Sequence, residues 1–461
     1  MTEKNCVILY GNTIITMDKD RQILKNAAIK IVKDRIVEIG TKKKLIASNP
    51  EASVIGSENF MVIPGLINAH QHLTGDRLIQ SCIPSSIKDT EAIFDWSVPI
   101  HASHSPEDDE ISATLSLAES ARCGITFTVE AGTVAFPEMV LKGFETVGVG
   151  GSIGSWGWDI GDGPYADSTD GVIERQLQVI ELTKNHPSVK GWVTLVGHDL
   201  MSDDLLQRAS NLARDNLTNL TFHLSPHAGE ASKYLEKTGM RPVSYINELG
   251  VLGSHVLIGH AVHLDNSELE TLLHSNTAVA SSPWAYLKLG QGITKFGRHP
   301  EFLSKGGRLC LGCDTENAGD GKDLLLTARL FAGLMQEAQL DIDKPTAHYA
   351  LELITIGGAE ALGLKEEIGS IEIGKRADMV LIDTSGPSWQ PLAPDPVMQL
   401  IWGASSSDID SVIVGGKLIV EGKKCKNFDE LGLTDEAKSR QKNLLKSAGL
   451  NPRSYWPITT Y

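Results

Sequence analysis

The chain of 461 residues lacks several features that define specialised classes of protein. Six cysteines are too few for a fold built on disulfide bonds. No run of 18 or more apolar residues is present, so we expect no membrane span. Lys and Arg, 42 against 58 Asp and Glu, do not cluster, which argues against a nucleic-acid or anionic-membrane partner. The first residues show no basic stretch followed by an apolar run, so we expect a cytoplasmic protein without a signal peptide.

The middle of the chain alternates short apolar runs with amphipathic segments of helical spacing. This alternation favours a parallel (β/α)8 barrel. A doubly wound open sheet is the rival, but no G-x-G-x-x-G motif opens any of the helical segments. The eight candidate strands are 61–68, 124–130, 147–154, 191–197, 217–223, 255–260, 277–282 and 309–314.

Both ends of the chain contain short alternating strands separated by turns, at 6–40 and again at 368–422. We expect them to form one small β-sandwich when the chain closes before and after the barrel; two independent β-modules are the alternative. The predicted organisation is a first part of the sandwich at 1–60, the barrel at 61–365, the second part of the sandwich at 366–430 and a C-terminal helical tail at 431–461.

The strongest chemical signal is an H-x-H pair, His70 and His72, where the first predicted barrel strand ends. Catalytic groups of such barrels lie at the carboxyl ends of the strands. In extended backbone, residues i and i+2 face the same way, so both imidazoles are able to aim at one point. Two neutral ring nitrogens on one edge suit a divalent metal, whereas two ordinary loop histidines are the alternative.

Three further predicted strands end in groups that bind metals or move protons: His223, His260 and Asp314. The first two are 37 residues apart (260 − 223), which is about one β/α unit of this chain. Asp314 follows 54 residues after His260 (314 − 260), which allows two compact units. Each residue therefore falls independently at the same predicted rim, which favours a shared site.

The order H-x-H, His, His, Asp resembles that of the metal-dependent amidohydrolase superfamily. PGLINAHQHL, RPVSYINELGVLGSHVLIGHAVHLDNSELE, YLKLGQGI and IGSIEIGKRADMVLID are similar to the triazine-hydrolase and S-adenosylhomocysteine-deaminase branch. The resemblance extends over most of the chain. It implies a metal-dependent hydrolase of carbon–nitrogen bonds other than peptide bonds.

The resemblance makes His70, His72, His223 and Asp314 the ligands of one divalent ion, for which Zn, Fe and Co are all suitable. Asp314 would also take a proton from the metal-bound water, and His260 would hydrogen-bond that water or the substrate oxygen. Binuclear relatives use a bridging carboxylated lysine on the fourth strand. Lys190 stands only at the start of that strand here, so we expect a mononuclear site.

One departure from the family pattern bears on the substrate. Deaminases of this branch read His-x-x-Glu on the fifth strand, and the Glu protonates a ring nitrogen; here Pro226 occupies that position. We therefore expect metal-bound hydroxide to cleave the C–N or C–S bond of an amide, urea or (thio)carbamate, near the herbicide-degrading phenylurea and molinate hydrolases. The alternative is a deaminase or dechlorinase of a purine, pterin or triazine, with His227 or Glu230 replacing the acid. A non-catalytic small-molecule-binding barrel is a third reading.

Several residues near the predicted rim are candidates for contacting the substrate. Trp156 and Trp158 are further aromatic candidates, whereas His101 and His104 are expected to be solvated loop residues. We expect a small-molecule substrate with an apolar or aromatic part, and a homo-oligomeric protein because relatives commonly assemble. The predicted substrate-binding residues are His198, Trp284, His227, Asn317 and Trp96.

Overall fold

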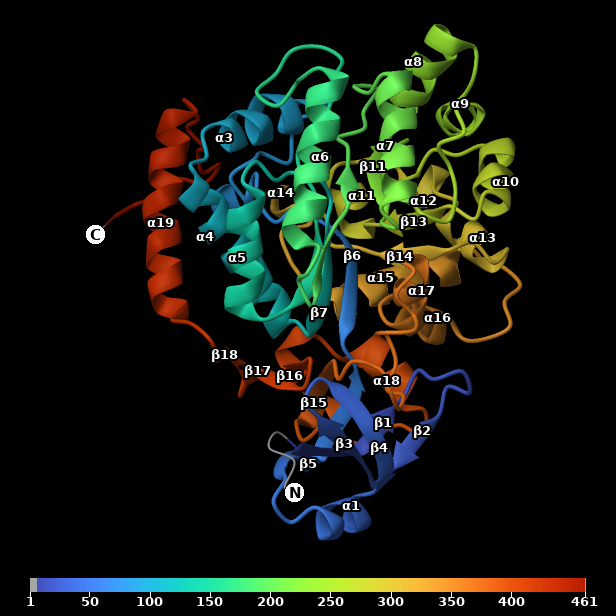
Figure 1. Ribbon diagram of the computed structural model, residues 1–461, viewed down its shortest axis with the longest axis vertical. Helices are drawn as coiled ribbons and strands as arrows, with labels where there is room; N and C mark the ends of the chain where they lie inside the picture. Colours follow the sequence, from blue (N-terminus) through green and yellow to red (C-terminus); the bar gives the residue numbers. More distant parts are fainter. Residues whose placement is uncertain (1–5, 461) are drawn as a thin grey trace.

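The computed structural model describes residues 6–460, and strands from both ends of the chain share one nine-stranded sheet (Figure 1). The order is β18-β17-β16-β15-β5-β1-β3-β4, with β2 paired to β1. The antiparallel pair β5–β15 joins the two ends, so the alternative of two independent modules is wrong. The strands are β1 (Cys6–Ile15), β2 (Ile23–Lys25), β3 (Ala27–Val32), β4 (Arg35–Thr41), β5 (Ser53–Pro64), β15 (Met379–Asp383), β16 (Ile409–Val414), β17 (Lys417–Glu421) and β18 (Lys424–Cys425).

Two further sheets are parallel throughout, one of order β6-β7-β8-β9 and one of order β10-β11-β12-β13-β14. Their strands are almost wholly buried, as expected where helices cover parallel strands. The strands are β6 (Leu66–Gln71), β7 (Ile125–Glu130), β8 (Gly150–Ile153), β9 (Val189–Gly191), β10 (Val193–Thr194), β11 (Leu220–Leu224), β12 (Val256–His260), β13 (Ala278–Ser281) and β14 (Leu309–Leu311).

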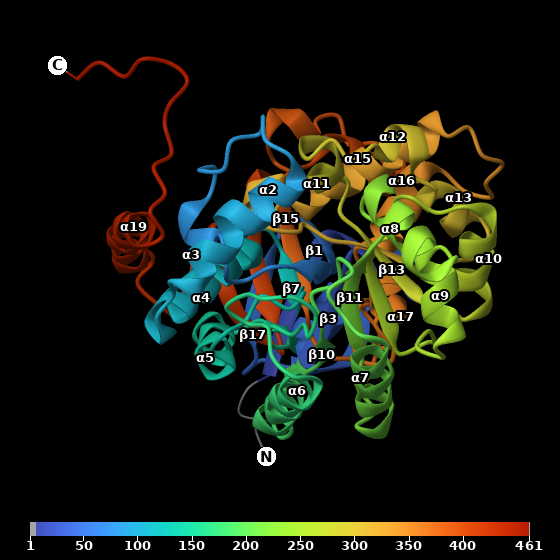
Figure 2. The same cartoon turned by 90° about the horizontal axis from the view of Figure 1, so that it is seen from above.

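The helices alternate with these strands and surround them (Figure 2). Parallel neighbours require such crossovers, because a tight turn cannot return the chain to the starting edge. The helices are α1 (Lys42–Ser48), α2 (Asp89–Glu91), α3 (Val98–Ala102), α4 (Pro106–Arg122), α5 (Pro137–Val147), α6 (Thr169–Thr183), α7 (Asp203–Asp215), α8 (Ala228–Thr238), α9 (Pro242–Glu248), α10 (Asn266–His274), α11 (Pro283–Lys288), α12 (Ile293–Phe296), α13 (His299–Ser304), α14 (Glu316–Gly319), α15 (Leu324–Glu337), α16 (Thr346–Leu353), α17 (Ile356–Ala361), α18 (Pro396–Gly403) and α19 (Glu430–Ser447).

Backbone hydrogen bonds connect the two parallel sheets at both edges. At one edge, β9 continues into β10 through Trp192, whose N–H donates to the Ile153 carbonyl at 2.9 Å. At the other edge, the N–H groups of Cys313 and Asp314 donate to the carbonyl of His70 at 3.1 and 2.9 Å. The ends of β14 and β6 are therefore held together next to the H-x-H pair.

Each of the eight predicted ranges contains a strand, but the first range spans parts of two strands. Residues 61–64 belong to β5 of the end sheet, and β6 starts only at Leu66. The break falls at Gly65, where a Cβ would lie 2.0 Å from the Thr126 hydroxyl oxygen. The boundary between the two parts is thus at Gly65 rather than between residues 60 and 61.

The C-terminal segment, predicted as a helical tail, contains α19, which lies beside α4 (Figure 2). Arg440 of α19 pairs with Asp108 of α4 at 2.8 Å. Residues 1–5, where the predicted first segment begins, and residue 461, where the predicted tail ends, lie outside the described residues. Within residues 6–460, no helix has the length and apolarity that crossing a bilayer requires.

Candidate active site

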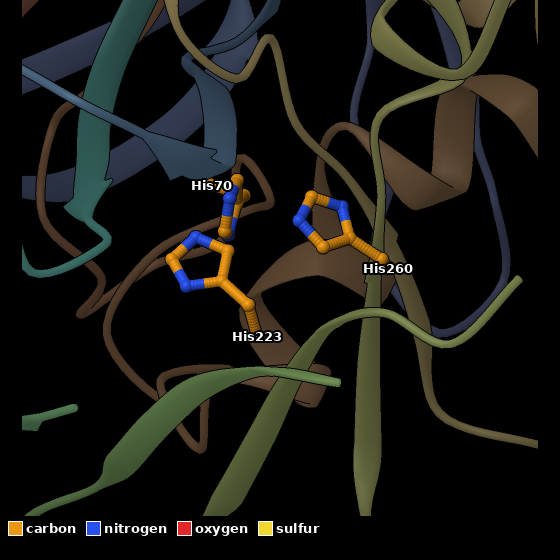
Figure 3. A group of neighbouring side chains, drawn as sticks. All are labelled: His70, His223 and His260. Atoms are coloured by element: carbon orange, nitrogen blue, oxygen red, sulfur yellow. The ribbon is translucent and has the colours of Figure 1, made fainter. Parts of the chain in front are cut away.

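Five side chains from four strand ends converge on one buried point. His70 lies in β6 and His72 directly follows it; His223 lies in β11 and His260 is the last residue of β12. Asp314 stands three residues beyond β14. Figure 3 shows the imidazoles of His70, His223 and His260 turned toward one another. The structure therefore brings together all the residues that the sequence selected as metal ligands or proton carriers.

The distances within this cluster are those of groups that share a ligand. Nε2 of His72 lies 3.2 Å from Nε2 of His223 and 3.6 Å from Oδ1 of Asp314. Nε2 of His70 lies 3.9 Å from the same oxygen, and Nδ1 of His260 lies 3.9 Å from Oδ2. Two groups of possible ligand atoms each lie within 4.8 Å of one another. One group comes from His70, His223 and His260, and the other from His70, His72 and Asp314.

Several ring nitrogens of the cluster form no hydrogen bond within the described part of the chain. Both ring nitrogens of His70, and Nδ1 of His72 and of His260, are buried without a hydrogen-bond partner among the described residues. Nδ1 of His223 donates to the Val196 carbonyl at 2.7 Å, so the lone pair of its Nε2 faces His72. Buried polar atoms are normally satisfied. A divalent cation fits this donor set of imidazoles and one carboxylate.

Two glycines make room for His70. A Cβ on Gly259 would lie 2.8 Å from Cε1 of His70, and one on Gly312 would lie 2.6 Å from its Cβ. Both distances are shorter than real carbon contacts, so any larger residue at either position would displace the imidazole. The backbone of β12 at Gly259, and the backbone directly after β14 at Gly312, thus leave space for the side chain of His70.

Burial sets the charge state of the cluster. It lowers the pKa of His70 and of His223 to about 3, and the pKa values of His72 and His260 fall well below 6.5 for the same reason. The imidazoles are therefore neutral, which is the form that binds a metal. Burial raises the pKa of Asp314 to about 6, against a hydrogen bond from the Thr315 N–H that lowers it.

The backbone at the rim adopts a conformation that side chains other than glycine rarely take. The φ angles are +79° at His260, +64° at Asp314 and +54° at His198. Such left-handed residues cost free energy and gather at functional sites. At each of these three positions the chain turns sharply as it leaves a strand and presents its side chain to the cavity.

A cavity of about 110 Å³ opens above the cluster and is lined by His72, His223, His260 and Asp314. The described residues that line it include no Lys or Arg. Its walls therefore suit an uncharged molecule with apolar or aromatic surface. The apolar wall consists of Ile93, Phe94, Val98, Trp156, Trp158, Val196, Leu200 and Leu289.

The predicted substrate-binding residues are placed differently from one another. His198 lines the cavity, and its ring stacks on that of His223 with a centroid distance of 5.2 Å. His227 lines a smaller neighbouring cavity instead. The other three, Trp284, Trp96 and Asn317, are not among the described residues that line either cavity.

The reasons for these three corrections are specific. Trp284 is the second residue of α11 and is 40% exposed, because that helix turns the ring outward. Trp96 packs against the apolar cluster that contains Leu444 of α19. Asn317 is a structural residue, since its amide nitrogen donates to Asp76 at 2.9 Å and its amide oxygen accepts from the Ile83 N–H at 3.1 Å.

A buried hydrogen-bond network was missed. His101 and His104, expected in solvent, are buried and share Oδ1 of Asp109 at 3.2 and 2.8 Å. The indole N–H of Trp156 donates to Nδ1 of His101. The network thus orients one wall of the cavity. The segment SPEDD carries a usable signal, because a helix starting after Ser105 brings Asp109 into its first turn, where its carboxylate accepts from the N–H groups of Ala135 and Phe136.

The sequence pattern of the amidohydrolase family matches residues 61–419, so the chain belongs to that family. It is a metal-dependent hydrolase of carbon–nitrogen bonds and takes one divalent metal ion. The resemblance to the branch of triazine hydrolases and S-adenosylhomocysteine deaminases is confirmed.

A 5-methylthioadenosine/S-adenosylhomocysteine deaminase of Syntrophobacter fumaroxidans is 28% identical over 429 residues, 92% of this chain and 95% of the relative. A zinc-bound adenosine deaminase of Xanthomonas campestris has a TM-score of 0.89 at 22% identity, covering 95% of this chain and 98% of its own. A zinc-bound atrazine chlorohydrolase of Arthrobacter aurescens has a TM-score of 0.85 at 22% identity, covering 94% and 100%. Both solved structures share the fold.

These relatives correct one expectation. The missing acid at Pro226 had favoured hydrolysis of amides, ureas or (thio)carbamates over that of heterocycles. The curated relatives that align over most of the chain are instead deaminases of 5-methylthioadenosine, S-adenosylhomocysteine and 5'-deoxyadenosine. The amide, urea and carbamate interpretation is therefore wrong, since proline at position 226 does not exclude a substrate with an aromatic nitrogen ring.

Proposed function

We propose that the protein hydrolyses an amino group from an aromatic nitrogen heterocycle of the adenine type and releases ammonia. The observation that carries this proposal is the placement of the His–Asp cluster at the floor of a cavity walled by Phe94, Trp156 and Trp158. Aromatic walls bind a flat ring by stacking, and the cluster then meets one edge of it. The alignment with adenosine-type deaminases along 92% of the chain supports the same reaction.

The proposed ligands of the metal are His70, His72, His223 and Asp314. The buried, unpartnered nitrogens of His70 and His72, and the 3.6 Å between Nε2 of His72 and Oδ1 of Asp314, support this assignment. When bound, the ion supplies a Lewis acid that makes water a nucleophile near neutral pH. The link of β9 to β10 and that of β14 to β6 support a closed (β/α)8 barrel as the frame that holds these residues.

The side chains of the cluster divide the proton transfers. Asp314 takes one proton from the attacking water as the water oxygen bonds to the ring carbon, and His260 orients that water by a hydrogen bond. Asp314 then passes its proton to the amino nitrogen, which leaves as ammonia with the electron pair of the broken C–N bond. The neighbouring ring nitrogen gains a proton during attack. The second proton of the water moves from the new hydroxyl to the acid that protonated the ring nitrogen, and the ring carbon becomes a carbonyl.

One feature favours a second candidate, the displacement of chloride or an alkylamine from a triazine-like ring. The cavity carries two carboxylates, and both are engaged: Asp314 in the cluster, and Asp76 with Asn317 at 2.9 Å and with Thr315. Neither is available to a ribose hydroxyl. The surface that lines the cavity is mainly apolar, which matches a heterocycle that bears alkyl substituents.

A substrate panel tests both candidates. The zinc-loaded protein is incubated with adenosine, 5-methylthioadenosine, S-adenosylhomocysteine, guanine, and amino- and chloro-triazines, and ammonia and chloride release are measured. Ammonia from the purines supports deamination, whereas conversion confined to triazines supports the second candidate. Conversion of none of them by protein carrying one equivalent of metal contradicts both.

A further inference from the structure

Glu230 is a buried carboxyl beside the active site that the proposed function has not used. It is the third residue of α8, and its side chain folds back toward β11, where Oε2 accepts from the Ser225 N–H at 3.0 Å. Only 2% of the residue is exposed. Oε1 is buried and has no hydrogen-bond partner within the described part of the chain. A buried carboxyl oxygen without a partner is stabilised when it binds a proton or a ligand.

Glu230 lines a second cavity, of about 50 Å³, together with His198, Phe94 and Gln291. The last three residues also line the cavity above the metal cluster, so the two spaces share a wall. A volume of 50 Å³ is large enough for ordered water. Water in this space would connect the Glu230 carboxyl with a ring held between Phe94 and the cluster.

We propose that Glu230 supplies the proton that the heterocycle nitrogen gains during attack, in place of the acid that Pro226 displaces from the strand end. This inference rests on the proposed function. The carboxyl reaches the rim from the first turn of the following helix, and Ser225, whose N–H it contacts, is the direct neighbour of Pro226. The chain thus keeps an acid at the end of β11 although the usual position has none.

The charged surroundings of Glu230 favour its protonated form. The pKa of Glu230 is raised to about 8, mainly by burial and also by Asp199 and Glu268, against the Ser225 N–H and Lys233, which lower it. Tyr234 of the same helix is buried beside it, and its own pKa is raised by burial and by Glu230. Glu230 is therefore neutral at pH 7 and able to donate a proton.

The same position stabilises the carboxylate once the proton has left. Glu230 lies in the first turn of α8, where the unsatisfied N–H groups and the helix dipole favour negative charge. His227, the other predicted substitute, precedes this helix as its N-cap residue. It is also only half-buried and does not line the main cavity. The geometry therefore selects Glu230 over His227.

The proton balance of the step is complete without another reactant. The O–H bond of Glu230 breaks as the N–H bond of the ring nitrogen forms, and the water oxygen bonds to the adjacent carbon. When the C–N bond to the amino group breaks, the new hydroxyl on that carbon becomes a carbonyl and its proton returns to Glu230. The carboxyl is thus regenerated in each turnover.

The experiment compares the zinc-loaded wild type with Glu230→Gln and with Glu236→Gln, a matched control whose exposed side chain lies on the same helix. We expect kcat/KM of Glu230→Gln on the best purine substrate to fall by about 10²–10⁴, the usual contribution of a positioned acid. Metal content and melting temperature are measured beside it. The decline of wild-type activity above about pH 8 should vanish in Glu230→Gln, since an amide does not titrate. Wild-type kcat/KM in Glu230→Gln, or an unchanged pH profile, overturns the proposal.

A second readout does not depend on turnover and separates the two claims. Infrared difference spectra record the carbonyl band of a protonated carboxyl in wild type and in Glu230→Gln, with and without purine, which lacks the amino group. If the wild type converts no substrate, the proposed function has failed. Even then, the proposal that the Glu230 proton reaches the ligand is supported if the wild type alone shows the band below pH 8 and purine shifts it. A missing band, or one indifferent to purine up to its solubility limit, overturns it.

Discussion

The Nδ1–H of His223 donates to the Val196 carbonyl, and this bond determines which nitrogen of the imidazole faces the cluster. With Nδ1 occupied by its proton, Nε2 carries the lone pair and lies 3.2 Å from Nε2 of His72. Second partners of this kind orient a metal ligand and hold its tautomer. The site is therefore organised for a cation by its surroundings as well as by its ligands.

Removal of the metal should abolish activity and weaken the fold. An ion that binds only the native state stabilises it, by about 4 kcal/mol at a concentration 1,000 times its dissociation constant. We expect chelation to lower the melting temperature and one equivalent of zinc to restore both melting temperature and turnover, with calorimetry and elemental analysis as the measurements. Restoration that requires two equivalents would contradict a mononuclear site.

Asp314→Asn should reduce both metal affinity and proton transfer. The amide is nearly isosteric, but it neither carries a charge nor accepts the proton of the attacking water. We expect a fall in kcat/KM of about 10³-fold or more, and a lower zinc content after dialysis. Asp341→Asn, at an exposed position far along the chain, is the control and should behave as the wild type. Full activity of Asp314→Asn with bound zinc would remove Asp314 from the mechanism.

Trp156→Phe tests whether the buried network orients the cavity wall. The substitution keeps an aromatic ring but leaves Nδ1 of His101 without its donor. We expect an increase in KM with little change in kcat, because the wall binds the ring without reaching the reacting carbon. An unsatisfied buried acceptor should also cost about 1–3 kcal/mol of unfolding free energy, measured in urea. Unchanged KM and stability together would show that the network is incidental.

The sequence predicts the convergence of these side chains, because strand ends are regular and the candidate residues recur there at unit spacing. The side chains that the structure brings together are His70, His72, His223, His260 and Asp314. The parallel strands were equally accessible, since each is a short apolar run between turns. Only the first strand failed, because Gly65 interrupts an apolar run whose two halves belong to different sheets.

The walls of the cavity were harder to predict, because they come from loops whose direction no periodicity describes. Trp284 and Trp156 both follow a strand end, yet the first points to solvent and the second into the cavity. Hydrogen bonds over long sequence distances decide this, as between Trp156 and His101. The sequence offers both Glu230 and His227 as substitutes and does not distinguish them, because the contact of Glu230 with Ser225 depends on where α8 starts.

The stability of the protein should fall as the pH rises from about 4.5 to about 8, because of the raised pKa of Glu230. Burial raises its pKa in the folded state from 4.5 to about 8. Because the folded pKa exceeds the unfolded one, this contribution is fully present below about pH 4.5 and is lost as the pH rises through about 8. Denaturant unfolding of the wild type and of Glu230→Gln at pH 5, 7 and 9 measures it. The difference between them should change with pH, and a constant difference would mean that Glu230 is already ionised in the native state.

Gly312→Ala should disrupt the cluster without touching any ligand. The new methyl carbon would lie 2.6 Å from Cβ of His70 and 2.8 Å from its carbonyl oxygen, so the strand that carries the H-x-H pair must move. A displacement of well under 1 Å matters here, because metal ligands tolerate errors of only about 0.2 Å. We expect lower zinc affinity and at least a tenfold loss of kcat/KM. Gly321→Ala is the matched control, since its Cβ would meet no atom of the described chain within 4 Å. If Gly312→Ala binds zinc as tightly as Gly321→Ala, the close packing around His70 is not what holds the metal ligands in register.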